Sequence, residues 1–266
     1  MKNQQIILAL AIVIMLSACS KVPVTNRKQV HLLPESEMIS MSITQYKEVL
    51  SKSQIISSGP DAQLVDKVGR NISNAAIQYM NQTGQSKKLI GYAWEYHLLQ
   101  SNEVNAWCMP GGKIAVYSAL LPVTKDEAGL AVVMGHEVGH AIAQHGNERM
   151  SQALVAQAGG QALSVALATK PQQTQELFGQ AYGIGATYGA LLPFSRTQES
   201  EADKIGMVIM AVAGYDPHAA IGLWERMKQM SGGGAPPELL STHPSDQHRI
   251  DDIKAFMPEA MKYYKK

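Results

Sequence analysis

The feature of the sequence that most constrains the fold is His136-Glu137-Val138-Gly139-His140, which lies inside the largely apolar segment 128–144. Histidines four positions apart share one face of an α-helix, so their ring nitrogens can meet at one metal ion. Glu137 lies beside that face and can reach a water molecule at the metal as a general base. Two buried imidazoles without a partner would be costly. The pattern therefore predicts a buried, metal-binding helix.

A third protein ligand has to come from another part of the chain, because a catalytic zinc site has three protein ligands and one open position. The extended pattern H-E-x-x-H-x-x-G-x-x-H is excluded, since Ala143 and Gly146 stand where it needs glycine and histidine. His145 follows His140 by five positions. We therefore expect His145 at the surface near the helix end, turned away from the ligands.

The best source of the missing carboxylate is the segment 195–203, where Glu199 and Asp203 are four positions apart. On a helix these two share a face, so one can bind the metal while the other orients a ligand histidine. Glu201 is expected on the opposite side of the helix. The alternative is an acidic, solvated helix start, which the helix dipole also favours.

With both motifs present, the sequence resembles the gluzincin metallopeptidases of the HtpX, BepA, Oma-type and CAAX prenyl protease 1 kind, in their single-domain lipoprotein branch. The shared patterns are H-E-x-x-H and S-R-x-x-E-x-x-A-D, the second of which is complete over residues 195–203. The resemblance implies an α+β, zincin-like fold, mostly helical with a small antiparallel or mixed sheet, and one Zn²⁺ per chain. It also implies Glu199 as the third ligand beside His136 and His140, with Asp203 and Arg196 supporting the ligands.

The resemblance extends to the C-terminal part of the chain. His243-Pro244, followed by Arg249-Ile250, is similar to the family's H-P-x-x-x-R-I element, with one extra residue here. This similarity implies that His243 is catalytic together with Glu137, which would take a proton from water and pass it to the leaving amine. His243 or Arg249 would donate to the negative charge that develops on the substrate.

A substrate-binding segment is expected around residues 105–112, which are similar to the family's N-A-aromatic-x-x-P-G-G element. The candidate substrate-binding residues are Asn105, Gly111, Gly112 and Arg249. The glycines and the predicted strand 113–117 would let a peptide pair as an added strand. An ordinary buried hairpin is the alternative.

The N-terminus predicts the compartment. Residues 1–18 combine Lys2, an apolar run too short to span a bilayer, and small residues at the end, as in a secretory signal peptide. Cys19 directly follows Leu-Ser-Ala, which resembles the lipobox of bacterial lipoproteins and implies a lipid on Cys19. An ordinary signal peptide is the alternative. We expect residues 19–35 to be a lipid-anchored tether and residues 36–266 to form the metallopeptidase domain. This places the protein in the cell envelope on the outer or periplasmic side, at the outer membrane if the cell is Gram-negative.

Periodicity predicts the main elements. Helical spacing covers 36–58 and 61–81, and alternation predicts strands over 92–98 and 113–117. Capping boxes beginning at Thr124 and Ser195 predict two helix starts. The uncharged stretches 153–169 and 177–194 are near the length of membrane spans. We favour buried or cleft-covering helices there over a membrane hairpin, and one hypothesis makes residues 150–194 a lid.

Composition excludes two further classes of protein, nucleic-acid-binding proteins and disulfide-rich scaffolds. A net charge of +1 gives no support for a nucleic-acid partner, and two cysteines exclude a disulfide scaffold. Cys108 is expected to be a small core residue.

We expect a zinc metalloendopeptidase that acts on misfolded or unassembled polypeptides. An envelope chaperone or assembly factor that retains the zinc fold, and a zinc hydrolase of another bond, remain alternatives. The intact Glu137 favours an enzyme, and the sequence does not give the oligomeric state.

Overall fold

The computed structural model describes residues 19–158, 174, 177, 178, 195–230, 239, 243 and 247–265. The expected signal peptide and most of the two uncharged stretches lie outside these residues. In the part of the chain that is described, no helix combines the length and apolarity needed to cross a bilayer.

The described elements are mainly helical, as the sequence predicts. The helices are α2 (Glu35–Lys52), α3 (Pro60–Gln82), α4 (Leu121–Thr124), α5 (Glu127–Ala143), α6 (His145–Ala158), α9 (Arg196–Val212), α10 (Ala219–Met230) and α12 (Gln247–Ala260), with 3-10 turns at Ser86–Leu89 and Ser118–Leu120. The strands are β1 (Cys19–Lys21), β2 (Lys28–Val30), β3 (Ile55–Ile56), β4 (Glu95–Leu99), β5 (Ala106–Met109) and β6 (Lys113–Tyr117). The expected α+β, zincin-like fold is confirmed.

One of the two predicted capping boxes is present. At the start of α9, Ser195 Oγ accepts a hydrogen bond from the Gln198 amide, and the Gln198 side chain accepts one from the Ser195 amide. The prediction at Thr124 was wrong. Its hydroxyl donates back to the carbonyl of Leu121, and Lys125 takes a left-handed φ of 69° that separates α4 from α5. Asp126 therefore caps α5 by accepting from the Gly129 amide.

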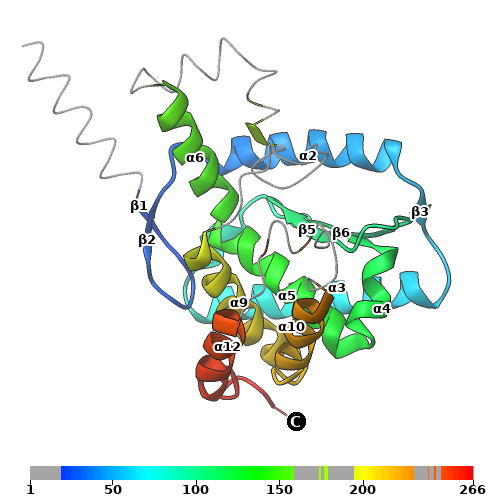
Figure 1. Ribbon diagram of the computed structural model, residues 1–266. Helices are drawn as coiled ribbons and strands as arrows, with labels where there is room; N and C mark the ends of the chain where they lie inside the picture. The colour runs from blue at the N-terminus through cyan, green and yellow to red at the C-terminus, as the bar shows by residue number, and fades with distance from the viewer. Residues whose placement is uncertain are drawn as a thin grey trace, which may run out of the picture.

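A mixed four-stranded sheet forms the middle layer, in the order β3-β4-β6-β5. β4 and β6 are parallel, and the other two pairs are antiparallel. α2 covers one face of the sheet, while α3 and α5 cover the other (Figure 1). Because side chains alternate along a strand, each strand contributes to both faces. The helix α5, which carries the predicted metal-binding motif, thus lies directly on the sheet, beside β5.

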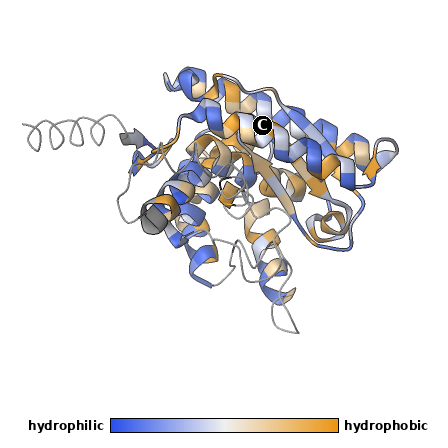
Figure 2. Ribbon diagram, turned by 90° about the horizontal axis from the view of Figure 1, so that it is seen from above, coloured by the Kyte–Doolittle hydropathy of each residue, from blue (hydrophilic) through white to orange (hydrophobic). Residues whose placement is uncertain are grey.

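Two hydrophobic cores lie on the two sides of the sheet. Leu98, Ile114 and Val116 pack with α3, α5, α9 and the C-terminal helices. Trp107, Met109 and Ala115 pack toward α2 and α6. Hydrophobic colours accordingly concentrate in the interior, with hydrophilic residues on the outer turns of the helices (Figure 2). β6 is buried except for its last residue, which is typical of a central strand.

Helices α5 and α9 are in close contact because glycines face each other at their crossing. A Cβ atom on Gly206 would lie 2.8 Å from the backbone carbon of Gly135 and 2.8 Å from the amide nitrogen of His136. On the next turn, a Cβ on Gly139 would lie 2.8 Å from the carbonyl oxygen of Ala202. These glycines bring the two predicted metal-binding motifs together.

We therefore expect Gly206→Ala to lower stability and weaken metal binding. The methyl group would meet backbone atoms, and such overpacking costs about 1–3 kcal/mol. Gly222→Ala in α10 is the matched control, because its Cβ would approach only Arg226 Nη1, at 3.4 Å. Urea unfolding of both variants gives the comparison. Equal stability of the two variants would show that the α5–α9 crossing tolerates the methyl group.

The N-terminal segment is folded, whereas the sequence predicted a tether over residues 19–35. β1 and β2 form an antiparallel hairpin, and Val22 and Leu33 are 0% and 3% exposed. Arg27 forms ion pairs with Glu148 of α6 at 2.7 Å and with Glu201 of α9 at 2.8 Å. Residues 19–35 are thus packed on the rest of the protein and do not form a separate tether, because apolar side chains and Arg27 have buried partners that are remote in sequence. The lipid on Cys19 stays a prediction.

Candidate metal centre

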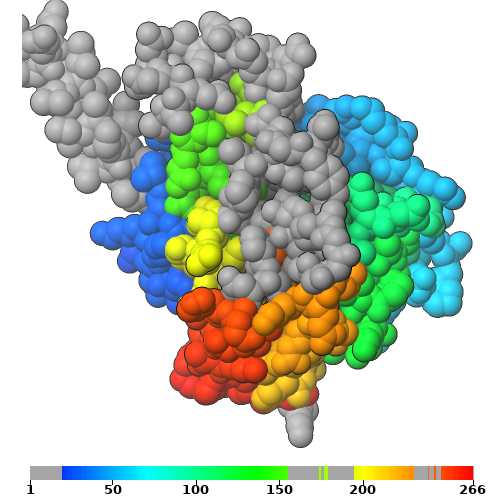
Figure 3. All heavy atoms as spheres, in the orientation of Figure 1, coloured from blue at the N-terminus to red at the C-terminus, as the bar shows by residue number. Residues whose placement is uncertain are grey.

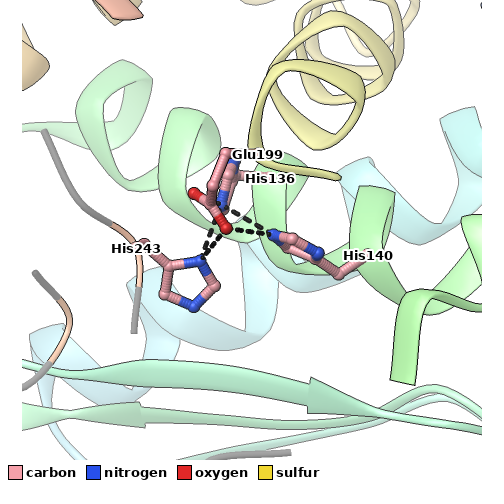
Figure 4. A group of neighbouring side chains, drawn as sticks. All are labelled: His136, His140, Glu199 and His243. Carbon is pink, nitrogen blue, oxygen red and sulfur yellow. Dashed lines mark hydrogen bonds and ion pairs between the residues drawn. The ribbon is translucent and has the colours of Figure 1, made fainter. Parts of the chain in front are cut away.

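The two motifs meet as predicted. His136 and His140 project from α5, and their Nε2 atoms are 3.1 Å apart. Glu199 projects from α9 toward both rings, with its Oε2 3.4 Å from His136 Nε2 and its Oε1 3.2 Å from His140 Nε2 (Figure 4). All three side chains are at least 95% buried. The structure thus brings together the three residues predicted as ligands.

The donor set fits zinc. Tetrahedral zinc binds nitrogen and oxygen ligands at about 2.0–2.2 Å, which puts neighbouring ligand atoms about 3.3 Å apart. The two Nε2 atoms are 3.1 Å apart, and each lies 3.2 or 3.4 Å from one of the two oxygens of Glu199, which is close to that edge. Imidazole nitrogens and a carboxylate are also the ligand types that zinc prefers in catalytic sites.

His243 joins this group. Its Nδ1 lies 2.9 Å from Glu199 Oε1 and 3.2 Å from His136 Nε2. One donor atom from each of the four residues lies within 4.8 Å of the others. The sequence predicts a catalytic donor at His243, and the structure places its ring among the ligands, above strands of the sheet (Figure 4). Its catalytic role stays a prediction.

Glu137 is buried next to the cluster but is not part of it. Its Oε1 lies 3.7 Å from His243 Nε2, and among the described residues that oxygen has no hydrogen-bond partner. Burial raises the pKa of Glu137, although His243 and His136 oppose the effect. A carboxylate with an unoccupied acceptor and a raised pKa is suited to accept a proton.

The charges around Glu199 favour its ionised, metal-binding form. Burial by itself would raise the pKa of Glu199, but electrostatic interactions with His243 and Arg249 hold it well below its usual value. Burial lowers the pKa of His140 well below its usual value, so its ring is neutral. For His136, burial and Arg249 lower the pKa, but Asp203 and the hydrogen bond to Glu199 act in the opposite direction, and the pKa is raised to about 9. Metal binding at His136 would therefore release a proton.

Asp203 orients His136, as predicted. His136 Nδ1 donates to Asp203 Oδ1 at 2.8 Å, so that once the second ring proton is released the lone pair of Nε2 faces the cluster. Arg249 holds Asp203 through two hydrogen bonds of 2.8 Å, from Nε to Oδ2 and from Nη2 to Oδ1. The guanidinium also pairs with Glu199 at 2.8 Å and lies 3.3 Å over the ring of Trp224.

Two residues predicted to act near the site take other positions. Arg249 is 6% exposed and is occupied by Asp203 and Glu199, so it is placed to support ligands rather than to bind substrate. Arg196 was expected to support the ligands, but it is exposed at the first turn of α9, with no ion-pair partner among the described residues. Arg196 is the first residue of α9 and is exposed, whereas Glu199 is 5% exposed.

His145 is buried, whereas the sequence predicted a surface histidine, and Glu201, expected on the side of α9 away from Glu199, is buried against it. His145 is 0% exposed, and its Nδ1 lies 2.9 Å from His140 Nδ1. Its Nε2 lies 3.1 Å from Glu201 Oε2. The expectation for His145 was wrong because α5 ends at Ala143, and the left-handed φ of 62° at Gln144 redirects the chain and returns His145 to the metal side.

The expected substrate segment is a hairpin. Gly111 and Gly112 have φ values of 80° and 78° and form the turn between β5 and β6. Asn105 precedes β5, where its Oδ1 accepts from the Ala106 amide. The prediction that a peptide would pair with residues 113–117 was wrong, because β6 already has β4 on one side and β5 on the other. The edge strand of the sheet on the α5 side is β5.

Some features of the site carried little signal in the sequence. Trp224 under Arg249 and the hairpin residue Arg27 belong to no motif. His145 had one usable signal, its position directly after the H-E-x-x-H helix. Cys108 is a buried core residue as expected, and burial raises its pKa well above the usual value.

Comparison with known proteins agrees with this geometry. Residues 66–257 match peptidase family M48. The chain is 35% identical over 243 residues to the mitochondrial metalloendopeptidase OMA1 of Schizosaccharomyces pombe, covering 90% of this chain and 66% of that protein. It is 27% identical over 224 residues to the beta-barrel assembly-enhancing protease of Escherichia coli, covering 77% of this chain and 45% of that protein. The chain thus spans just under two thirds of the first relative and less than half of the second. The match over most of its length, with the assembled zinc ligands, shows that the chain belongs to peptidase family M48, the zinc-dependent metallopeptidases.

Proposed function

We propose that this protein is a zinc-dependent endopeptidase that hydrolyses unfolded or unassembled polypeptides in the bacterial cell envelope. The observation that carries the proposal is the meeting of His136, His140 and Glu199 beside Glu137, whose Oε1 has no hydrogen-bond partner among the described residues. A folding factor that only retained the metal site would need the ligands but not a base.

The roles of the residues follow from their positions. Zinc held by His136, His140 and Glu199 would supply Lewis acidity, which lowers the pKa of water to about 7 and polarises a carbonyl group. Glu137 takes the proton of the attacking water and passes it to the leaving amine. His243, 3.7 Å from Glu137 and within the cluster, donates to the developing negative charge.

We propose that a polypeptide substrate binds along the outer edge of β5. The amide of Tyr117 bonds to the carbonyl of Asn105, and that of Gly112 to Met109, so the odd-numbered residues of this segment face β6. By the alternation of antiparallel strands, the backbone groups of Ala106 and Cys108 point the other way. All four residues of β5 are buried in this structure, so the proposal requires this edge to become accessible. Once accessible, its backbone would pair with an extended peptide next to α5, with little dependence on the peptide's sequence.

The envelope location rests on the N-terminal sequence and on the bacterial relative. Since β1 begins at Cys19 itself, a lipid there would hold the domain close to the membrane surface. Cys19→Ser is expected to abolish incorporation of radiolabelled palmitate and to move the chain from the membrane to the soluble fraction. An unchanged distribution would contradict the lipid anchor.

The enzymatic proposal is tested by zinc content and by cleavage of unfolded casein, with a folded protein as the comparison substrate. About one zinc per chain and chelator-sensitive cleavage of the unfolded substrate are expected. Bound zinc without cleavage of any substrate would favour the chaperone or assembly factor. Cleavage of short peptides alone would indicate a narrower hydrolase, and a folded protein without zinc affinity would refute the metal centre.

A further inference from the structure

The N-terminal hairpin is connected to the metal centre by an unbroken series of polar contacts. Thr25 Oγ1 and Arg27 Nε each donate to Glu201 Oε1 at 2.8 Å. Glu201 Oε2 lies 3.1 Å from His145 Nε2, and His145 Nδ1 lies 2.9 Å from His140 Nδ1. The hairpin lies against α6 and α9, the segments that carry these residues (dark blue beside green and yellow in Figure 3). Every group between Arg27 and His140 is buried.

The carboxylate of Glu201 sets the direction of the hydrogen bonds that His145 and His140 make. An ionised carboxylate is an acceptor only, so His145 must carry its proton on Nε2 and donate it to Glu201. A neutral imidazole protonated on Nε2 has a lone pair on Nδ1. His140 must then carry its proton on Nδ1 and donate it to His145, which leaves the lone pair of His140 Nε2 directed at Glu199 and His136.

We propose that Arg27, Glu201 and His145 are positioning residues that hold His140 in the tautomer whose Nε2 lone pair faces the metal centre. The proposal rests on the zinc-dependent function given above. It means that the N-terminal hairpin contributes to zinc binding through Arg27. The series of hydrogen bonds that supports the other histidine ligand, His136, has fewer members. His136 Nδ1 donates directly to Asp203, and Arg249 binds Asp203. Each of the two histidine ligands is thus connected to a carboxylate of α9 that an arginine binds. Arg249 of α12 binds Asp203, and Arg27 of the hairpin binds Glu201.

Glu201→Gln tests the relay with almost no change in shape. Arg27 and Thr25 bind Oε1 as donors, so the oxygen of the new amide stays there and its NH₂ group faces His145. That NH₂ group can only donate, which reverses the relay and places a proton on His140 Nε2, where it opposes metal binding. We expect zinc affinity to fall about 10–100-fold, the range typical of residues that orient metal ligands. Glu201→Asp keeps the acceptor and should restore most of the affinity.

Glu148→Gln is the matched control. Glu148 binds the same guanidinium at 2.7 and 2.8 Å and also accepts from Gln198, but it makes no hydrogen bond to His145 in the described structure. We expect this variant to lose stability in urea while binding zinc within about two-fold of wild type. Zinc affinity is measured on the full chain by competition with a chromogenic chelator.

Equal zinc affinity of Glu201→Gln and Glu148→Gln, with wild type binding zinc normally, would overturn the relay and leave the proposed function intact. If wild type binds no zinc, the proposed function itself fails. A second measurement applies even if Glu201→Gln does not fold. In zinc-free wild-type protein with ¹⁵N-labelled histidine, the ring spectrum should show His140 protonated on Nδ1. Protonation of His140 on Nε2 would overturn the relay.

Discussion

Glu137→Gln is expected to abolish peptide hydrolysis while leaving zinc bound. The two side chains have nearly the same shape, but the amide cannot accept a proton from water. General acid–base catalysis contributes about 10²–10⁴-fold to rate, so we expect kcat to fall by about 10³-fold or more. Glu137 is 3% exposed and its Oε1 has no hydrogen-bond partner among the described residues, so the change disturbs little else.

The measurement pairs cleavage of a fluorogenic peptide with zinc content for wild type, Glu137→Gln and Glu225→Gln. Glu225 is an exposed residue of α10, so its variant controls for the loss of one negative charge. A rate for Glu137→Gln within ten-fold of wild type would assign the base to another residue. Loss of zinc together with activity would instead make Glu137 part of the binding site.

Glu199→Gln is expected to have its largest effect on the metal itself. Glu199 is the only predicted ligand with a negative charge, and it lies between His136 and His140 in the cluster. Residues that merely support ligands change metal affinity by about 10–100-fold. Loss of a ligand's charge should exceed that range, so we expect zinc affinity to fall by more than about 100-fold and activity to fall with it.

Chelator competition at fixed pH gives the affinity, again with Glu225→Gln as the control for charge. Arg249 remains paired with Asp203 in this variant, so the fold should persist without the Glu199 carboxylate. High zinc concentrations should restore part of the activity. If Glu199→Gln binds zinc like wild type, the third ligand is not Glu199, and His243 becomes the next candidate because its Nδ1 lies in the same cluster.

The predictable part of this site lies within single helices. The spacing of His136 and His140 and that of Glu199 and Asp203 each fixed a shared helix face, because the geometry of an α-helix is the same wherever it lies. The start of α9 at Ser195 was predictable for the same reason, since a capping box is satisfied by neighbours in sequence. Strand β6 was also predicted with its observed bounds.

Local patterns failed where one residue redirects the chain. A helix continued past Gln144 would turn His145 away from the ligands, but the left-handed conformation of Gln144 starts α6 in a new direction. The same holds at Lys125, which separates α4 from α5. A non-glycine residue in that conformation is uncommon and has no clear sequence signature, so neither break could be expected.

The sequence by itself determined the metal-binding helix, the carboxylate on a second helix, and the chemistry that these groups can perform. Only the tertiary structure decided that α5 and α9 approach closely enough to form one site, since that contact depends on glycines about seventy positions apart. It also decided that Arg249 supports ligands, that β5 rather than β6 is the edge strand, and that the N-terminal hairpin is connected to His140 through Glu201 and His145. The physical reason is the sequence separation of the interacting residues. Helix periodicity and caps involve residues within one or two helical turns. A buried charge must be paired, but its partner is often remote in sequence and is set by the packing.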